Sequence, residues 1–247
     1  MHSRFPMTRT SPTTLRCDVS AARRVVLPRG YRTRFSVREE LVHVGREAFV
    51  LAHPADAEAL ISVEDFARDE RLPYWADLWP SAFALGETLL AAGAPTKGRP
   101  AIELGCGIGL AACCAVRAGF ELTVTDYYDE ALAFTAANVL ANTGVRVTTQ
   151  PLDWRAIPKD QVRFDYVLAA DVLYERAYGP LLAHVVDRLL VPGGTAWIAD
   201  PGRVGGAAFV EEASALGVRV TSHASRLTIG DREHEITCYE LTAPVGR

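Results

Sequence analysis

Glycines and one acidic residue give the clearest chemical signal in this chain. The run Glu103–Gly109 reads ELGCGIG and stands between a strand-like and a helix-like segment. Glycines are needed at such a turn because the backbone must bend sharply and come close to a ligand. Asp126 follows 21 positions after Gly105, at the end of the next strand-like run. A carboxylate there can accept both hydroxyls of a ribose, so the pattern predicts a site for a nucleoside-containing cofactor.

The spacing of these glycines differs from that of a dinucleotide-binding loop. Such a loop reads G-x-G-x-x-G, and its third glycine would fall at position 110, where this chain has Leu110. The carboxylate of Glu103 would also repel a pyrophosphate. We therefore expect that the site does not bind NAD.

Alternating strand-like and helix-like segments after Pro100 must position this loop. The alternation predicts a parallel sheet with helices on both faces, a Rossmann-like α/β fold. Two successive strands at the end predict that one of seven strands is antiparallel. The expected strands are Ala101–Leu104, Glu121–Asp126, Val145–Thr149, Tyr166–Ala170, Thr195–Ala199, Val218–Ser222 and Glu235–Leu241, and the expected helices are Gly109–Ala118, Asp129–Ala141, Pro180–Leu190 and Ala207–Leu216.

Residues 35–99 are expected to cover the cofactor site of this core, which spans residues 100–247. Two short β-like runs, Glu40–Val44 and Glu47–Ala52, flank a Gly-Arg turn and predict a hairpin. A short helix is expected over Pro54–Phe66. A second helix is expected to begin at Pro80, because proline suits the first turn of a helix.

Residues 1–34 carry eight arginines and a single acid, Asp18. Two interpretations remain open for this segment. One is a flexible basic extension of a cytoplasmic protein. The other is a transit peptide, since an Arg-rich, Ser-rich and acid-poor segment is typical of organellar targeting, and the protein would then lie in an organellar matrix.

Composition excludes several other classes of protein. The net charge of −4 argues against a nucleic-acid partner, because phosphate binding usually needs a basic excess. No run of 18 apolar residues occurs, so no membrane span is expected. The five cysteines form no C-x-x-C pair and are expected to be reduced thiols. The six histidines show no ligand spacing, so no metal site is expected.

The motif E-L-G-C-G-x-G, together with Thr-Asp at the end of the second strand, resembles class I S-adenosylmethionine-dependent methyltransferases from about Pro100 onward. Two further segments are more specific: PYWADLWP over Pro73–Pro80 and ADVLY over Ala170–Tyr174. They resemble the seven-β-strand protein lysine methyltransferases of family 16, especially those that act on the electron-transfer flavoprotein β-subunit. Bacterial relatives of that group are often described as similar to nicotinamide N-methyltransferase.

The resemblance implies a role for each matching residue. Trp79 would pack beside the methionine end of S-adenosylmethionine, and Asp126 would hold the ribose. Asp171 and Tyr174 match a D-x-x-Y element that lines the methyl-transfer site and would be catalytic. Ordinary packing remains an alternative for the tryptophans, for Tyr74 and Trp75, and a helix cap for Asp171. The other implied cofactor-binding residues are Glu103, Gly105 and Gly107 at the amino-acid moiety, Asp153 and Trp154 at the adenine, and Ala170.

An amine is the acceptor that this element favours. A lysine side chain, with a pKa of about 10.4 in water, must lose its proton before it can attack a sulfonium carbon. An acidic, partly desolvated entrance to the methyl-transfer site can attract the ammonium and let its proton leave. Asp171, Tyr174 and Glu175 are the candidates, and whether Asp171 is a base or an electrostatic guide stays open.

Three functions remain open at this point. The first is methylation of a protein lysine, and the second is methylation of a small amine similar to nicotinamide. The third is a partner protein that binds the cofactor without catalysis. Amino-methyltransferases of nucleic acids resemble one another in a (D/N/S)-P-P-(Y/F) motif, which is absent from Asp171–Tyr174. We expect a monomer with a protein or small-amine acceptor, and no nucleic-acid or membrane partner.

Overall fold

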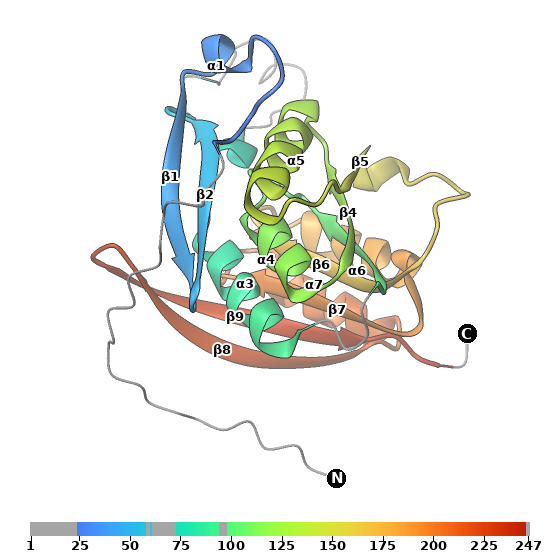
Figure 1. The fold of residues 1–247 in the computed structure, drawn as a ribbon. Helices are drawn as coiled ribbons and strands as arrows, with labels where there is room; N and C mark the ends of the chain where they lie inside the picture. The colour runs from blue at the N-terminus through green and yellow to red at the C-terminus, as the bar shows by residue number, and fades with distance from the viewer. Residues whose placement is uncertain (1–23, 58–59, 61–72, 94–97, 246–247) are drawn as a thin grey trace.

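Seven strands form one sheet in the computed structural model, which describes residues 24–57, 60, 73–93 and 98–245 (Figure 1). Their order is β5-β4-β3-β6-β7-β9-β8, and only β9 runs antiparallel to its neighbours among these described strands. The predicted α/β sheet with one antiparallel strand is confirmed. The strands are β3 (Pro100–Leu104), β4 (Glu121–Asp126), β5 (Thr148–Pro151), β6 (Phe164–Ala170), β7 (Leu190–Asp200), β8 (Arg219–Ile229) and β9 (Arg232–Thr242).

Helices cover both faces of the sheet. On one face α3, α4 and α5 pack side by side, and their apolar residues share one hydrophobic core. On the other face α6 and α7 pack together over a second core. The sheet between them is therefore buried on both faces, as expected for a parallel sheet. The helices are α3 (Pro80–Ala92), α4 (Leu110–Ala118), α5 (Asp129–Thr143), α6 (Tyr178–Leu189) and α7 (Gly206–Ala215).

The strand order reverses between β3 and β6. From β3 the chain moves outward to β4 and β5, and then it returns to pair β6 with the other edge of β3. Ligands of open α/β sheets bind outside the carboxyl ends of the strands at such a point. The glycine loop follows β3 and Asp171 follows β6, so the fold brings both predicted parts of the site to this crevice.

The predicted N-terminal hairpin is present. β1 (Val37–Val44) and β2 (Glu47–Pro54) pair antiparallel around the turn at residues 45–46, and the hairpin stands beside α5 (Figure 1). The predicted helix over Pro54–Phe66 lies largely outside the described residues. Pro80 begins α3 as expected, after a short 3-10 turn, η3 (Tyr74–Ala76).

Two asparagines of α5 bind β2 as a neighbouring strand would. The Asn142 side chain accepts from Val50 N and donates to Val50 O, both at 2.8 Å. The Asn138 side chain does the same for Ala52, at 2.8 and 2.9 Å. Four residues of helix rise about 6 Å and two residues of strand about 6.6 Å, so the two spacings match.

Part of the predicted N-terminal extension packs onto the body of the protein. For residues 24–34 the expectation of a flexible extension is wrong, because the Val25 side chain is buried and only 1% exposed. α1 (Tyr31–Arg34) then places the Tyr31 ring against Phe35 and Phe134, with centroids 5.3 and 5.8 Å apart. Residues 1–23 lie outside the described part of the chain.

Some predicted element boundaries differ from the observed ones. Val145–Thr149 was expected as a strand, but β5 begins at Thr148, where pairing with Thr123 of β4 starts. β8 and β9 are longer than expected because they stay paired up to their turn, with Ile229 opposite Arg232. Many side chains of β8 are exposed, so the hydrophobic pattern does not mark its length.

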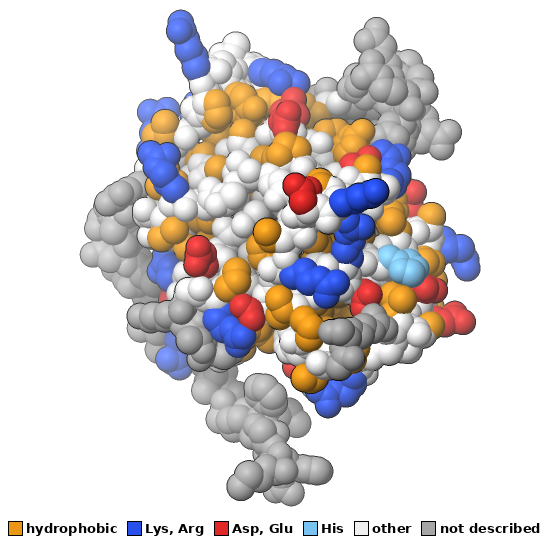
Figure 2. Space-filling model, turned by 90° about the vertical axis from the view of Figure 1, so that its right-hand side faces the viewer, with side chains coloured by type: hydrophobic (Ala, Val, Ile, Leu, Met, Phe, Trp, Pro, Cys, Tyr) orange, Lys and Arg blue, Asp and Glu red, His pale blue; other side chains and the backbone are white. Residues whose placement is uncertain are grey.

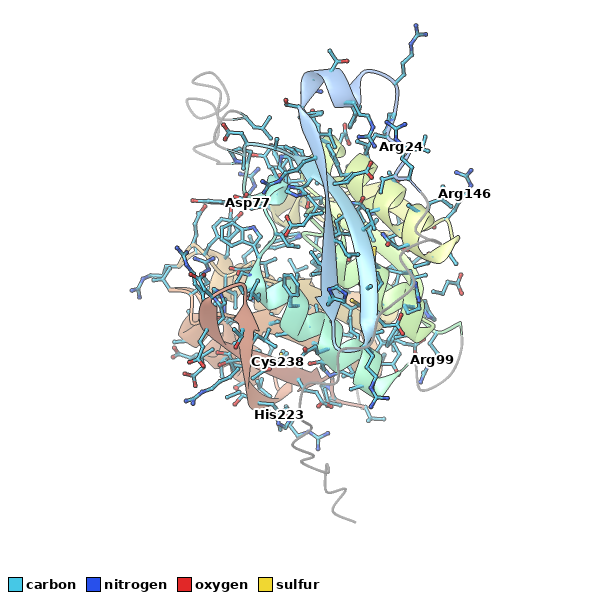
Figure 3. The ribbon with its side chains drawn as sticks, turned by 60° about the vertical axis from the view of Figure 1, so that its left-hand side comes forward. Arg24, Asp77, Arg99, Arg146, His223 and Cys238 are labelled. Atoms are coloured by element: carbon cyan, nitrogen blue, oxygen red, sulfur yellow. The ribbon has the colours of Figure 1, made fainter. Side chains whose placement is uncertain are left out.

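Cys106, Cys113, Cys114 and Cys238 are free thiols in the described chain, and all four are buried. Cys238 of β9 lies beneath α3, with its Sγ 3.8 Å from the Thr88 hydroxyl (Figure 3). Within the described ranges, no three His, Cys, Asp or Glu side chains gather in a way that could hold a metal ion. No helix described there combines the length and apolar character that spanning a membrane requires.

Candidate active site

The glycine loop is shaped by backbone conformations that favour glycine. Gly107 has φ 55° and Gly109 has φ 86°, both in the left-handed region. A Cβ on Gly109 would lie 2.8 Å from the Thr135 side chain, and one on Gly107 would lie 3.2 Å from the Trp75 carbonyl oxygen. The Thr135 hydroxyl donates to Gly107 O at 2.9 Å. The third glycine therefore serves the packing of the loop onto α5.

Asp126 lies at the end of β4 and faces this loop. Its carboxylate is buried, and it accepts from Gly107 N at 3.0 Å and from Tyr128 N at 3.1 Å. These bonds fix both carboxylate oxygens at the edge of the cleft while leaving further lone pairs for a ligand. The position suits the vicinal hydroxyls of a ribose, as the sequence predicts.

Glu103 supplies a buried carboxyl group that lacks a full set of partners. It is 2% exposed, and its Oε2 has no hydrogen-bond partner in the described structure. Burial, followed by the charge of Asp126, raises the pKa of Glu103 to about 8. Glu103 lines a small cavity together with Trp79, Gly105 and Gly107. An unpartnered carboxylate oxygen there fits a ligand ammonium such as that of the methionine moiety of S-adenosylmethionine.

The cleft widens from this cavity toward Asp153 and Trp154, which line it as predicted for the adenine. Asp153 caps the 3-10 turn η4 (Trp154–Ala156) by accepting from Arg155 N at 3.0 Å. Its carboxylate is also paired with the Arg155 guanidinium at 2.8 Å, a contact that the sequence did not indicate. The indole of Trp154 meets Tyr178 edge to face at 5.9 Å. Contact of Asp153 or Trp154 with adenine stays a prediction.

Asp171 also lines the cleft and comes directly after β6. It adopts φ 59°, which is uncommon for a residue other than glycine, and its backbone N donates to Ala199 O at 2.9 Å. Its side chain is 2% exposed. Arg203 Nε donates to Asp171 Oδ1 at 2.6 Å, and Ser81 Oγ donates to Oδ2 at 3.1 Å. Both carboxylate oxygens are thus engaged within the protein.

These contacts add one residue to the expected site and remove another. Arg203, which no motif marks, binds Asp171 through its Nε. Glu175 was a candidate for the acceptor mouth, but it is exposed and lies outside the residues that line the cleft. Ser81 was missed because nothing in its local sequence marks a residue 90 positions from its partner.

A belt of five aromatic rings forms the wall of the cleft. The ring of Tyr74 lies 5.0 Å from that of Tyr174 and 6.0 Å from that of Trp79. Tyr174 continues the belt to Tyr178 at 5.2 Å, and Tyr178 continues it to Trp154. Ordinary packing was one interpretation of Tyr74, but its side chain lines the cleft and the residue is 38% exposed.

Trp75, in contrast, packs in the core as expected. It is 8% exposed and contacts Phe35 and Phe134 at 5.9 and 5.6 Å. Ala170, the last residue of β6, lines both the cleft and the cavity of Glu103. The predicted site residues therefore line one cleft and the cavity beside it, which share Trp79, Gly105, Gly107 and Ala170.

Known proteins match this chain over its central part. The family model described as lysine methyltransferase matches residues 70–203. EEF1A lysine methyltransferase 3 of Mus musculus is 32% identical over 136 residues, which cover 53% of this chain and 57% of that protein. The electron transfer flavoprotein beta subunit lysine methyltransferase of Xenopus laevis is 31% identical over 137 residues, 53% of each chain. The chain thus spans about half the length of these curated relatives.

Solved structures show the same fold at low sequence identity. N-methyltransferase NodS from Bradyrhizobium japonicum, in complex with S-adenosylhomocysteine, has a TM-score of 0.54 at 15% identity, covering 73% of this chain and 97% of its own. The [4+2]-cyclase SpnF has a TM-score of 0.53 at 17% identity, covering 66% and 81%. Because the family model matches more than half of the residues, the chain belongs to the lysine methyltransferase family of class I S-adenosylmethionine-dependent methyltransferases.

Proposed function

We propose that this protein transfers a methyl group from S-adenosylmethionine to the side-chain amine of a lysine in another protein. One observation carries the proposal: the aromatic belt adjoins the cavity of Glu103 through Trp79, which lines both spaces. Aromatic faces attract ammonium groups without forming hydrogen bonds to them. The relatives named as lysine methyltransferases support the same substrate class.

Each end of the crevice has a distinct task in this reaction. When bound, S-adenosylmethionine supplies a methyl group on a positively charged sulfur. Glu103 would accept from the ammonium of its amino-acid moiety, and Asp126 would accept from its ribose hydroxyls. Trp79 would pack beside the sulfur end. These residues would hold the cofactor next to the aromatic belt, where its methyl group would be supplied to the amine.

The belt also assists loss of the acceptor's proton. A lysine that enters the cleft lined by Tyr74 and Tyr174 leaves water, and desolvation disfavours its charged form. The neutral amine then has the lone pair that attack requires. The ring faces stabilise positive charge on the methylated product, so the same wall serves the acceptor before and after transfer.

A small amine is the second candidate acceptor, because a cleft lined by tyrosines also suits a flat ring similar to nicotinamide. A single experiment separates the two. The purified protein is incubated with methyl-labelled S-adenosylmethionine and a heat-treated cell lysate, which is then divided into protein and small-molecule fractions. We expect label in the protein fraction, on lysine. Label confined to small molecules would favour the second candidate, and no label would indicate a protein that binds the cofactor without catalysis.

We further propose that the protein acts as a monomer in the cytoplasm and has no nucleic-acid partner. The net charge of −4 supports the absence of a nucleic-acid partner, as does the face shown in Figure 2, where acidic and basic side chains are interspersed. Binding along a phosphate backbone favours a continuous basic surface.

A further inference from the structure

Arg203 is the one group that covers the Asp171 carboxylate from the solvent side among the described contacts. The Arg203 side chain is 34% exposed, whereas that of Asp171 is 2% exposed. Their charge-assisted hydrogen bond of 2.6 Å is short. Ser81 on α3 holds the second carboxylate oxygen from inside. An acceptor ammonium that enters the cleft therefore meets a carboxylate whose charge is already paired.

The position of Arg203 is fixed by its own loop. Asp200, at the end of β7, accepts from Gly202 N at 2.9 Å and from Arg203 N at 3.0 Å. The guanidinium lies over the ring of Trp79, with Cζ 5.2 Å from the centroid. Arg203 is thus held between Asp171 and the tryptophan that separates the cleft from the cavity of Glu103.

We propose that Arg203 is a positioning residue that screens Asp171, so that the acceptor amine can give up its proton close to neutral pH. The inference rests on the proposed function. An unscreened carboxylate would bind the ammonium and favour its charged form, which cannot attack the methyl group. With Arg203 in place the pair is nearly neutral, and the desolvating belt then favours the free amine. Asp171 accepts no proton in this scheme, and the proton of the acceptor ammonium leaves to solvent water before the amine attacks.

Other charged and titratable groups surround the same space. Asp200 lies behind Arg203, and its Oδ1 has no partner in the described structure. The remaining groups line the cleft or the adjoining cavity, and all four test proteins keep them: Tyr74, Asp77, Glu103, Cys106, Asp126, Tyr127, Tyr128, Asp153, Arg155, Tyr174 and Tyr178.

The test compares four proteins: the wild type, Arg203→Gln, Asp171→Asn and the double variant. The first measurement is the rate of methyl-label transfer to heat-treated lysate as a function of pH. Arg203→Gln should move the profile by about one pH unit toward alkaline pH, and Asp171→Asn should move it the opposite way. The double variant should return close to the wild type. Arg203→Lys, which keeps the charge, should restore most of the wild-type profile.

The second measurement does not require methyl transfer. Butylamine is titrated calorimetrically at neutral pH into each protein loaded with S-adenosylhomocysteine. Arg203→Gln should bind the butylammonium about tenfold more tightly and Asp171→Asn about tenfold more weakly, with the double variant near the wild type. Arg99→Gln is the matched control, since its ion pair with Asp165 lies away from the cleft and should change neither measurement (Figure 3).

Two results would overturn the inference. Equal butylammonium affinities in all four proteins would show that the pair has no electrostatic effect on the acceptor. A loss of transfer in Asp171→Asn that persists in the double variant, with Arg203→Gln active, would make Asp171 the proton acceptor. Failure of the proposed function gives a different result. The wild type would then label no lysate protein, whatever the ranking of butylammonium affinities among the four proteins.

Discussion

Glu103 shows how one buried side chain can make cofactor binding depend on pH. Its pKa of about 8 means that the carboxyl is protonated at neutral pH before a ligand arrives. Pairing with the cofactor ammonium requires the ionised form. We therefore expect the affinity for S-adenosylhomocysteine to rise as the pH increases toward 8, with uptake of a proton by the buffer at neutral pH. Calorimetry in buffers of different ionisation enthalpy measures this proton.

Glu103→Gln is the control for that prediction and should remove the pH dependence. The same residue affects stability without ligand. Its pKa is higher in the folded than in the unfolded protein, so unfolding releases a proton between the two values. Stability of the ligand-free protein should fall as the pH rises through that window, and Glu103→Gln should flatten the curve. An affinity that does not vary with pH in the wild type would contradict the assignment.

Tyr174 tests whether the aromatic belt acts as a wall. Tyr174→Leu removes the ring that joins Tyr74 to Tyr178 and should lower turnover by about tenfold or more. Tyr174→Phe keeps the ring and should retain most of the activity, with cofactor affinity unchanged in both variants. The measurement is label transfer at saturating cofactor. Equal losses in the two variants would assign the role to the hydroxyl instead.

The cofactor end of the site could be predicted from the sequence, whereas the acceptor end could be predicted only in part. Glu103, Gly105 and Gly107 lie within one loop, and Asp126 follows at a fixed spacing, so local pattern is sufficient. The pairing of Asp171 with Ser81 and Arg203 joins residues 90 and 32 positions apart. No spacing rule covers such contacts, because they depend on how α3 and the loop after β7 dock on the sheet.

At the scale of elements, α5 connects the hairpin to the glycine loop through Asn138. Its side chain binds both backbone groups of Ala52 and also donates to Ile108 O at 2.8 Å. Asn138→Ala leaves these buried groups without partners and should lower the free energy of unfolding by about 2–4 kcal/mol. Chemical denaturation measures the loss.

Asn142→Ala is the matched comparison for the Asn138 variant. Asn142 is only partly buried, so water can replace part of its bonding to Val50, and the loss should be smaller. Equal losses would indicate that burial does not decide the effect. The asparagine pair also shows why the docking of α5 on β2 could not be predicted: amides at i and i+4 of a helix suggest a solvent-facing side in the sequence, and only the docked hairpin gives them partners.

At the scale of the whole molecule, the N-terminal segment contributes to the core. Val25 is 1% exposed and its neighbour Val26 is 80% exposed. Val25→Asp should therefore cost about 2–4 kcal/mol of stability, because it places a charge in an apolar environment. Val26→Asp should cost little. Thermal unfolding of the two variants, which differ by one position, measures the contrast.

Removal of residues 1–34 should accordingly lower stability, because it removes Val25 and Tyr31 from the core. Phe35 connects the N-terminal segment to the glycine loop. Its ring contacts that of Trp75, and the carbonyl oxygen of Trp75 lies close to Gly107. Loss of Tyr31 and Val25 loosens the support of Phe35. The sequence did not indicate that this arginine-rich segment packs in the core, because two apolar residues among many charges give no periodic pattern.

The asparagine pair on α5 has one more consequence, for self-association. An unpaired strand edge exposes backbone donors and acceptors that another chain can capture, which is a common route to fibrous aggregates. On β2 those groups at Val50 and Ala52 are already satisfied by side-chain amides. The helix thereby closes the β2 edge of the hairpin against addition of a further strand, and the amides that fasten it remove one route by which copies of the protein could associate.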